Sequence, residues 1–339
     1  MKYMLLVMGL LSVPYNLSHA EEGGELGGEE FSFALTGDMP YGDTQVPRFD
    51  QLIKQVNRDP EVKFVFHAGD IKGGGERCDD EKILARFQEF LNFKPALIYT
   101  PGDNEWTDCH RISNGGYHPL ERLDFLRQVF FPNPDLSIGS HPISVHSQTH
   151  MSGFEAFVEN VWFMRDGIVF GTLHVVGSNN DLKPWSGLDP TDSIANPRSD
   201  RISEFEQRRE AAIAWLDEIF ARAKRRNAKG VFLVMQANPR FDLPANDPAR
   251  AGFKDIIDHL RARVAEFGEP VVLAHGDFHE YLVDKPFDTY GDNPRLPNFT
   301  RVQTFGSPRV NWIKVHVLPD SPAVFLFEQK ILQQPEPQD

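Results

Sequence analysis

Short apolar runs alternate along the chain with segments in which apolar residues recur every three or four positions. The first pattern is typical of buried strands, and the second is typical of helices that turn one face to a core. The runs that predict strands cover residues 31–35, 62–66, 96–99, 168–176, 231–235 and 271–274. From about Tyr281 the chain is strand-rich, and we predict antiparallel strands at residues 301–305, 310–317 and 323–328.

Three predicted helices lie between these strands. Asp79 and Asp80 begin the first helix, and Ser203 with Glu206 forms a capping box that opens the second. The apolar residues that we expect to face the core are Ile83, Leu84, Phe87, Phe90 and Leu91 in the first, Ile213, Leu216, Ile219 and Phe220 in the second, and Phe253, Ile256, Ile257, Leu260, Val264 and Phe267 in the third.

This order of elements predicts an α/β or α+β sandwich in one domain, residues 31–332. Two loop-rich segments, residues 135–160 and 178–201, are expected to form walls around a site, because binding residues are often carried on loops. Residues 333–339 form a polar tail. The net charge of −14 excludes a broad basic surface for nucleic acid or an anionic membrane.

The N-terminus has the pattern of a secretory signal. Lys2 precedes a short apolar segment, residues 3–13, and Ser18, His19 and Ala20 fit a cleavage site. We therefore predict a signal peptide at residues 1–20 and a flexible linker at 21–30. The apolar segment is too short to cross a bilayer, which needs about 20 residues. The mature protein is predicted to be exported, periplasmic or secreted, with no membrane span after signal cleavage.

The chain has two cysteines, Cys78 and Cys109, and each follows the end of a predicted strand. In an oxidising compartment two cysteines favour one disulfide, and we predict that these two are joined.

Polar motifs follow the predicted strands at the points where they end. The first three strands run into Gly37-Asp38, Gly69-Asp70 and Gly102-Asp103-Asn104-Glu105, and two later strands run into Gln236 and into His275-Gly276-Asp277-Phe278-His279. Asp38 and Asp70 are 32 residues apart, and Asp70 and Asp103 are 33 apart, so each gap fits one βαβ unit. The carboxyl ends of such strands line one ligand crevice. Carboxylates gathered there repel one another, and a divalent cation relieves that repulsion, so the motifs predict metal binding.

In their order and spacing these motifs resemble the calcineurin-like metallophosphoesterases. The family pattern is D-x-H, GD, GNH[DE], a strand-end His and GHxH, and the resemblance covers nearly all of the mature chain. It implies a four-layer αββα sandwich with two divalent metal ions at the sheet edge. It also implies hydrolysis of a phosphomonoester or phosphodiester by a metal-bound hydroxide.

Carried over by position, the resemblance assigns Asp38 to the first metal and makes Asp70 the bridge between both. Asp103 would bind the second metal, and Asn104 would stabilise the reacting phosphate. The remaining ligands by position are Gln236, Asp277 and His279, with His279 on the first metal. In an alternative register Asn104 binds the second metal, and Asp103 is an acid that contacts the ligands but not the metal.

This chain departs from the family pattern at several of these positions. Pro40 replaces the His of D-x-H, and the nearby Tyr41 is a candidate ligand. The first site keeps Asp38, Asp70 and His279, whereas the second has only oxygen donors. A set of oxygen donors favours Mg, Mn or Ca over Zn, whereas the mixed first site could take Mn, Fe or Zn, so the identity of the metal stays open among these five.

The catalytic His of the family is also replaced, by Asn104. An amide donates a hydrogen bond to a phosphoryl oxygen but does not shuttle a proton. His275 is the candidate substitute, with His67 and His110 as further possibilities. Lys72 is a candidate phosphate ligand. Glu105 is a possible metal ligand, although we favour a place next to the ligands without contact to the metal.

These residues lead to two interpretations of function. The first is an exported metal-dependent phosphoesterase that acts on a small phosphorylated substrate. The alternative is a catalytically impaired member of the same fold that binds a metal or a ligand. The replaced histidines favour the alternative, whereas the complete set of carboxylates favours the enzyme.

Overall fold

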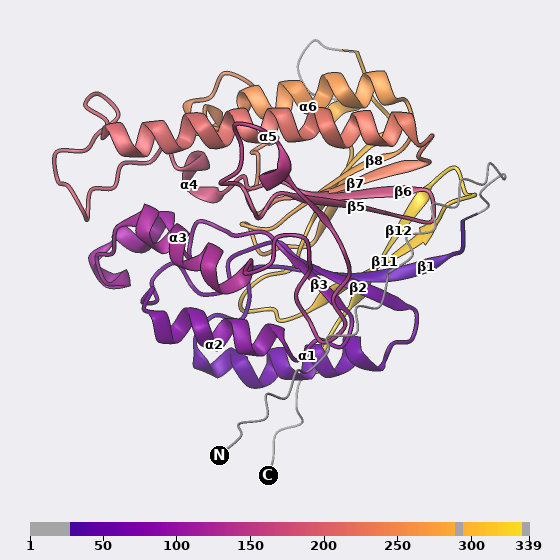
Figure 1. Ribbon diagram of the computed structural model, residues 1–339, viewed down its shortest axis with the longest axis horizontal. Coiled ribbons are helices and arrows are strands. Elements are labelled where there is room, and N and C mark those ends of the chain that lie inside the picture. Colours follow the sequence, from indigo (N-terminus) through magenta and orange to yellow (C-terminus); the bar gives the residue numbers. More distant parts are fainter. Residues whose placement is uncertain (1–27, 289–293, 334–339) are drawn as a thin grey trace, which may run out of the picture.

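The computed structural model describes residues 28–288 and 294–333. Two mixed β-sheets pack face to face, and helices cover both outer faces of the pair, which gives four layers (Figure 1). The predicted αββα sandwich is therefore confirmed. The predicted signal peptide, most of the linker and the polar tail beyond residue 333 lie outside the described residues.

The first sheet has the strand order β12-β11-β1-β2-β3. β1 (Phe31–Thr36), β2 (Val62–His67) and β3 (Ala96–Tyr99) are parallel, and β11 (Trp312–Leu318) pairs antiparallel with both β1 and β12 (Val324–Lys330). Because the first three strands run the same way, the residues that follow them meet at one edge of the sheet.

The second sheet has the order β4-β5-β6-β7-β8-β10-β9. Its parallel centre comprises β6 (Ile168–Thr172), β7 (Gly230–Val234), β8 (Val271–His275) and β10 (Phe299–Gln303). Antiparallel strands complete both sides: β4 (His146–Ser147), β5 (Val161–Arg165) and β9 (Leu282–Asp284).

The two pairs of long helices lie on opposite sides of the sandwich (Figure 1). α1 (Val46–Arg58) and α2 (Asp80–Phe90) cover the first sheet, whereas α5 (Ser199–Arg225) and α6 (Lys254–Phe267) cover the second. α2 begins where the Asp79 carboxylate accepts a hydrogen bond from the Lys82 backbone N–H, which satisfies one free donor of the first turn. The shorter helices are α3 (Pro119–Phe130) and α4 (Gly177–Asn180), and 3-10 turns span Asp43–Gln45, Thr107–His110, Ile112–Asn114, Gln148–His150, Pro248–Arg250 and Pro286–Asp288.

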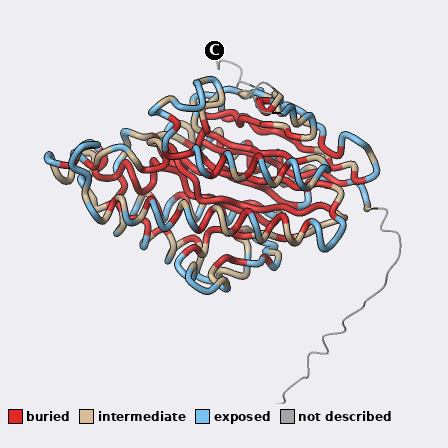
Figure 2. The backbone as a smooth tube through the Cα atoms, turned by 90° about the horizontal axis from the view of Figure 1, so that it is seen from above, coloured by how far each residue is buried: buried red, intermediate tan, exposed pale blue. Residues whose placement is uncertain are grey.

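Phenylalanine rings fill the space between the two sheets. The Phe33 ring of β1 stacks on Phe64 at 4.8 Å and meets the edge of Phe232, from the other sheet, at 4.9 Å. Phe170 lies 5.1 Å from Phe64, so contacts between the sheets recur along the interface. Figure 2 shows the strands buried between helices whose outer sides are exposed. Burial of these rings holds the sheets together and leaves the loops at the strand ends free for other chemistry.

The structure corrects several details of the sequence analysis. Ser203 lies inside α5, which begins at Ser199, so the predicted capping box is wrong. Leu84 and Leu91 are 44% and 37% exposed, because the buried face of α2 is Ile83, Arg86 and Phe90. The strand predicted at residues 168–176 ends at Thr172.

The C-terminal strands follow the prediction in part. β11 and β12 are antiparallel as expected, but β10 is parallel to β8 and antiparallel only to β9. The spacing of the first three strands implied α1, for which the sequence analysis gave no bounds, and the analysis missed β5. None of the described helices is long and apolar enough to cross a membrane.

The predicted disulfide joins Cys78 and Cys109, with their Cα atoms 5.8 Å apart. Both sulfur atoms pack against the backbone carbonyl of Asn104, at 3.5 and 3.7 Å. The bridge therefore ties the segment before α2 to the turn that follows β3, and it borders the polar loop that carries Asn104.

Replacing both Cys78 and Cys109 by Ser should lower the free energy of unfolding by about 3–4 kcal/mol, because the bridge restricts the unfolded chain. The bridge closes a loop with a sequence separation of 31 residues. Urea unfolding of the double variant and of the wild type measures the loss. Wild-type protein treated with a reductant is the control and should show the same loss. A difference near zero would contradict a stabilising bridge.

Candidate functional site

Side chains that follow strands of both sheets meet at one edge of the sandwich. Asp38 follows β1 and Asp277 follows β8, yet the Asp277 backbone N–H donates a hydrogen bond of 2.8 Å to Asp38 Oδ1. Asp70 follows β2, and its two carboxylate oxygens accept hydrogen bonds from the backbone and the amide of Asn104, at 3.2 and 2.8 Å. The structure thus brings together residues that are up to 239 positions apart.

The backbone is strained at several of these residues. Asp38, Asp70, Asp277 and His279 have φ angles of 56°, 55°, 77° and 62°, in the left-handed region that L-residues with side chains seldom adopt. Such strain costs roughly 1–3 kcal/mol per residue and gathers at functional sites, where surrounding structure holds it in place. The left-handed backbone at Asp38, Asp70 and Asp277 sets the direction in which each carboxylate leaves the end of its strand.

Glycines next to these residues allow the close approach. A Cβ atom on Gly102 would lie 2.1 Å from Asp70 Oδ1, and one on Gly276 would lie 2.2 Å from Asp38 Oδ2. Any larger residue would displace a carboxylate. The repeated Gly-Asp pattern of the sequence therefore has a packing cause at these two positions.

Tyr41 and Asn104 lie between Asp70 and His279. The Tyr41 hydroxyl is 3.2 Å from Asp70 Oδ2, 3.1 Å from the Asn104 amide nitrogen and 3.3 Å from His279 Nε2. His279 Nε2 is in turn 3.7 Å from Asp38 Oδ1. Tyr41, which the sequence analysis named as a possible ligand, thus lies within the cluster.

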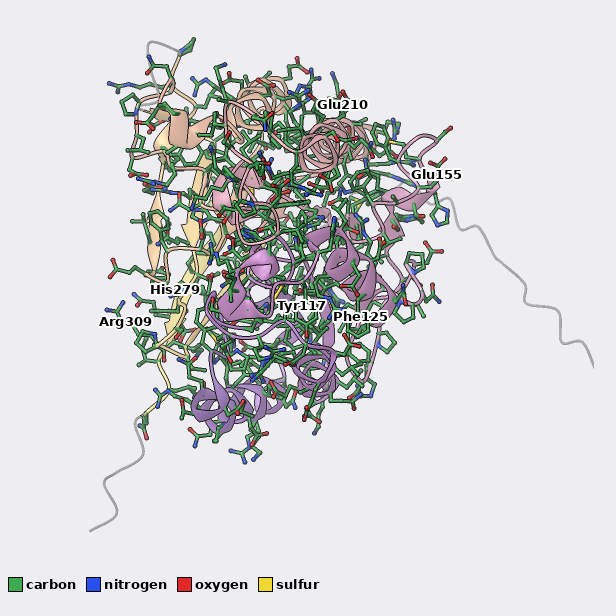
Figure 3. All side chains as sticks on the ribbon, turned by 90° about the vertical axis from the view of Figure 1, so that its left-hand side faces the viewer. Tyr117, Phe125, Glu155, Glu210, His279 and Arg309 are labelled. Atoms are coloured by element: carbon green, nitrogen blue, oxygen red, sulfur yellow. A yellow bond between two sulfur atoms is a disulfide. The ribbon has the colours of Figure 1, made fainter. Side chains whose placement is uncertain are left out.

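The ring of His279 is oriented by the backbone. Its Nδ1 lies 2.7 Å from the carbonyl oxygen of Ser307, and a carbonyl only accepts, so Nδ1 carries the proton. Burial lowers the pKa of His279, which favours the neutral form of the ring. Figure 3 labels His279 beside Arg309, on the turn that supplies this carbonyl. Nε2 therefore turns an unprotonated lone pair toward Tyr41 and Asp38.

Glu105 joins the loops that carry Asp70 and Gly102. Its Oε1 accepts hydrogen bonds from the backbone N–H groups of Asp70 and Gly102, at 3.0 and 2.7 Å, and from the Tyr99 hydroxyl at 2.8 Å. The carboxylate is fully buried, and it fixes the loops after β2 and β3 relative to each other.

Asp103 and Asp277 form the other half of the cluster. The Ser178 hydroxyl is 2.8 Å from Asp103 Oδ2 and 3.0 Å from Asp108 Oδ1, and the Asn238 backbone N–H donates to Asp277 Oδ2 at 3.2 Å. Sequence reasoning missed Ser178, Asp108 and Asn238. Only Asn238, which follows β7, carried a strand-end signal.

Three candidate residues make other contacts. Gln236 is fully buried, and its Oε1 accepts a hydrogen bond of 2.6 Å from the Gly177 backbone N–H. The Lys72 ammonium donates to the carbonyls of Gly73 and Glu76. His275 Nδ1 contacts the carbonyl of Gly276, and its Nε2 has no hydrogen-bond partner among the described residues. None of these contacts is with a carboxylate of the cluster.

The two further histidines are bound to the backbone. His67 is fully buried, with Nε2 3.0 Å from the Met39 carbonyl, and His110 Nδ1 accepts from the Gly187 N–H at 3.1 Å. Burial lowers the pKa of both to about 4. These contacts orient loops. Within the described residues, no imidazole forms a hydrogen bond with Asn104.

Burial, with repulsion between the carboxylates as a further cause, raises the pKa values of the acidic groups in the site. Burial, followed by the negative charge of Asp103, raises the pKa of Asp70 well above its usual range. Burial and the charge of Asp277 raise the pKa of Asp38 in the same way, and burial raises the pKa of Asp277 to about 7. Burial and the charge of Asp70 raise the pKa of Tyr41, so its hydroxyl keeps its proton.

The mixed oxygen and imidazole donors of Asp38, Asp70 and His279 fit a divalent cation such as Mn²⁺, Fe²⁺ or Zn²⁺ better than the residues of the second site do. Within residues 28–288 and 294–333, no three His, Cys, Asp or Glu side chains lie in a geometry that would hold a metal ion. The first site nevertheless offers carboxylates that repel one another and a neutral imidazole held by a backbone carbonyl, which is the usual support of a metal-binding histidine. At the second site the Gln236 oxygen already accepts a hydrogen bond from Gly177.

A family model described as "Calcineurin-like phosphoesterase" matches residues 31–281. The chain therefore belongs to this family, as the motifs indicated. Its members are typically hydrolytic phosphoesterases and usually bind divalent metal ions. A search of the curated proteins found no match.

Several solved structures are similar to this chain. TT1561 of Thermus thermophilus is 10% identical with a TM-score of 0.46, over 89% of this chain and 99% of that one. PhoD is 12% identical with a TM-score of 0.47, over 86% of this chain and 64% of that one. Phosphopantetheinyl hydrolase (PptH) from Mycobacterium tuberculosis is 15% identical with a TM-score of 0.41, over 83% and 91% of the two chains.

Asp277→Asn should stabilise the metal-free protein relative to wild type increasingly as the pH rises from about 4 to about 7. In this window the unfolded chain has ionised Asp277, whose ordinary pKa is about 4, while the folded chain keeps it protonated up to about 7. Stability from this carboxyl is therefore lost as the pH rises. We expect a gain of at least about 1 kcal/mol at pH 8 and almost none at pH 4.

Urea unfolding of both proteins in the presence of a chelator measures this difference. The comparison of variant with wild type is needed because His67, His110 and His275, whose pKa values burial lowers, change stability in the opposite sense over the same window. A difference between the two proteins that does not change with pH would contradict a raised pKa at Asp277.

Proposed function

We propose that this chain is a divalent-cation-dependent phosphoesterase that hydrolyses a phosphomonoester or a phosphodiester. The observation that carries the proposal is the meeting of Asp38, Asp70, Asp103, Asp277 and His279 at one edge of the sandwich. Burial and mutual repulsion make this cluster costly without a counter-charge. Membership of a family whose members usually bind divalent metals supports the same function.

Asp38, Asp70 and His279 are the residues that we assign to a first cation, with Asp103 and Asp277 beside a second. A bound cation supplies Lewis-acid polarisation of a phosphoryl oxygen and activation of water. The Asn104 amide, 2.8 Å from Asp70 Oδ2, is placed to donate a hydrogen bond to a phosphoryl oxygen. Tyr41 keeps its proton and is a second donor at the same place.

A second candidate function is a binding module that has lost catalysis. Two observations favour it: the Gln236 oxygen accepts a hydrogen bond from Gly177, and Asn104 stands where the family has its catalytic histidine. In this interpretation one cation or a ligand occupies the Asp38 side of the cluster without turnover. Metal content and hydrolysis together separate the two functions.

Asp70→Ala should lose bound cation and lower phosphoesterase activity by roughly a hundredfold or more. This is the usual loss when a group that helps to stabilise the charge of the transition state is removed. Elemental mass spectrometry of purified protein gives the metal content. Hydrolysis of 4-nitrophenyl phosphate and bis(4-nitrophenyl) phosphate with Mn²⁺, Mg²⁺ or Ca²⁺ gives the activity. Asp124→Ala, an exposed aspartate of α3, is the matched control and should keep both.

The possible outcomes distinguish the two functions. About two cations per chain with hydrolysis support the enzyme. One cation without hydrolysis supports the binding module. Wild-type protein that binds no cation and hydrolyses neither ester would contradict both, and an Asp70→Ala variant that keeps its metal would remove the bridging role.

We also propose that the protein is exported. The Cys78–Cys109 bridge supports an oxidising compartment, because structural disulfides are rare in reducing ones. N-terminal sequencing of the protein recovered from fractionated cells should begin at Glu21 and place it in the periplasmic or secreted fraction. Protein that keeps residues 1–20 in the cytoplasmic fraction would contradict export.

A further inference from the structure

A pocket of about 270 Å³ opens beside the Asp103–Asp277 half of the cluster. Its lining joins these two carboxylates to basic side chains and to an aromatic ring. The residues around it include Asp103, Asp277, Arg111, Lys183, Arg240 and Phe278. The pocket thus places positive charge next to the site where we propose that the phosphoester is cleaved.

One wall of the pocket is a strained turn. Ser178, Asn179, Asn180 and Asp181 have consecutive φ angles of 52°, 56°, 55° and 65°, so this segment winds left-handed. A left-handed turn costs roughly 1–2 kcal/mol per residue with a side chain. Strain of this kind persists where surrounding contacts hold it, and it points to a functional role.

Hydrogen bonds to a distant loop hold the turn. The Asn179 amide donates to the Pro248 carbonyl at 3.0 Å, and the Asn180 amide donates to the Gly252 carbonyl at 2.9 Å. The turn places the Ser178 hydroxyl on Asp103, and the Lys183 backbone N–H donates back to the Ser178 carbonyl at 3.2 Å. The turn therefore fixes the backbone of Lys183 in the wall of the pocket.

Lys183 differs from the other two cations of the pocket. Arg111 is paired with Asp108 at 2.7 Å, and Arg240 with Asp242 at 2.9 Å. The exposed Lys183 ammonium has no hydrogen bond or ion pair within the part of the chain that the structure describes.

Phe278 adds an apolar surface to the pocket. Its ring is 45% exposed, and the Arg240 guanidinium lies over it at 5.1 Å from the centroid. An exposed ring beside an unpaired ammonium suits a group that has a flat apolar body and a charged end.

We propose that this pocket is a subsite for a second anionic group of the substrate, held chiefly by Lys183 with Arg240 behind it. The chain then prefers phosphoesters whose leaving group is an aryl carrying a carboxylate. This inference rests on the proposed function, since Asp103 and Asp277 admit an anion beside them only when a cation neutralises their charge.

Matched phosphonates test the subsite without requiring hydrolysis. Isothermal titration calorimetry in Mn²⁺ compares benzylphosphonate with 4-carboxybenzylphosphonate on the full chain. Wild type should bind the carboxylate-bearing probe roughly tenfold or more tightly, the usual range for a hydrogen bond to a charged group. Lys183→Ala should remove most of that ratio, and Arg240→Ala should reduce it.

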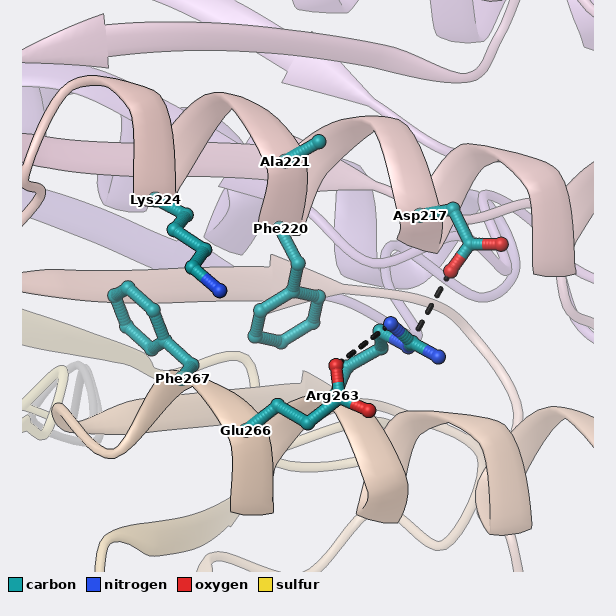
Figure 4. Close-up of a pocket in the computed structure, with 7 residues that line it drawn as sticks. All are labelled: Asp217, Phe220, Ala221, Lys224, Arg263, Glu266 and Phe267. Carbon is teal, nitrogen blue, oxygen red and sulfur yellow. Dashed lines mark hydrogen bonds and ion pairs between the residues drawn. The ribbon is translucent and has the colours of Figure 1, made fainter.

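Lys224→Ala is the matched control. Lys224 is an exposed lysine of α5 that lines a groove between α5 and α6, among Phe220, Phe267 and the Arg263–Glu266 pair (Figure 4). The Lys224→Ala substitution removes the same charge without changing the Lys183 pocket, so the affinity ratio of the two probes should stay at the wild-type value. Circular dichroism of each variant checks that the fold is kept.

Each outcome decides between the subsite and the proposed function. Equal affinity of wild type for the two probes, or a ratio unchanged in Lys183→Ala, overturns the subsite and leaves the phosphoesterase intact. Selective binding without hydrolysis of any aryl phosphate overturns the phosphoesterase and keeps the subsite. Failure of wild type to bind either probe in Mn²⁺ overturns the subsite, and the hydrolysis assays then decide the phosphoesterase separately.

Discussion

Carboxylates that follow strands of two different sheets gather at one edge of the sandwich, against their mutual repulsion. The hydrogen bond from the Asp277 backbone to Asp38 crosses between the sheets and lowers the pKa of Asp38, against the larger effect of burial. Glu105 ties the loops after β2 and β3 together from below. The aromatic contacts between the sheets supply the rigidity that such an arrangement needs, because a packed core does not deform gradually.

Backbone strain is concentrated where this edge forms. The turns at Asp38, Asp70 and Asp277 all adopt left-handed angles, and a second run of such angles begins at Ser178. Glycines beside the first three give the space that the strained residues require. Energy stored in this way is consistent with a site arranged for a ligand, since the same residues in relaxed turns would separate their carboxylates.

The two halves of the cluster differ in chemistry. On the Asp38 side a neutral imidazole and two carboxylates surround Tyr41, and the backbone carbonyl of Ser307 fixes the imidazole. On the Asp103 side the Ser178 hydroxyl and the Asn238 backbone N–H donate to the carboxylates, and a basic pocket adjoins them. This asymmetry fits an arrangement in which one half holds a cation tightly and the other half meets the substrate.

Local signals in the sequence were enough to identify the family, the strand-end acids and the disulfide, because each strand ends in a short motif with a recognisable spacing. The partners of those motifs were not predictable in the same way. Gln236 looks like a ligand in the sequence, but its oxygen is engaged by Gly177, 59 residues earlier. Ser178 and Lys183 carry no motif, and they reach the site only because a left-handed turn is held by a loop more than 60 residues away. Sequence patterns report periodicity and nearest neighbours, whereas contacts between distant loops depend on how the two sheets pack, and only the folded chain decides them.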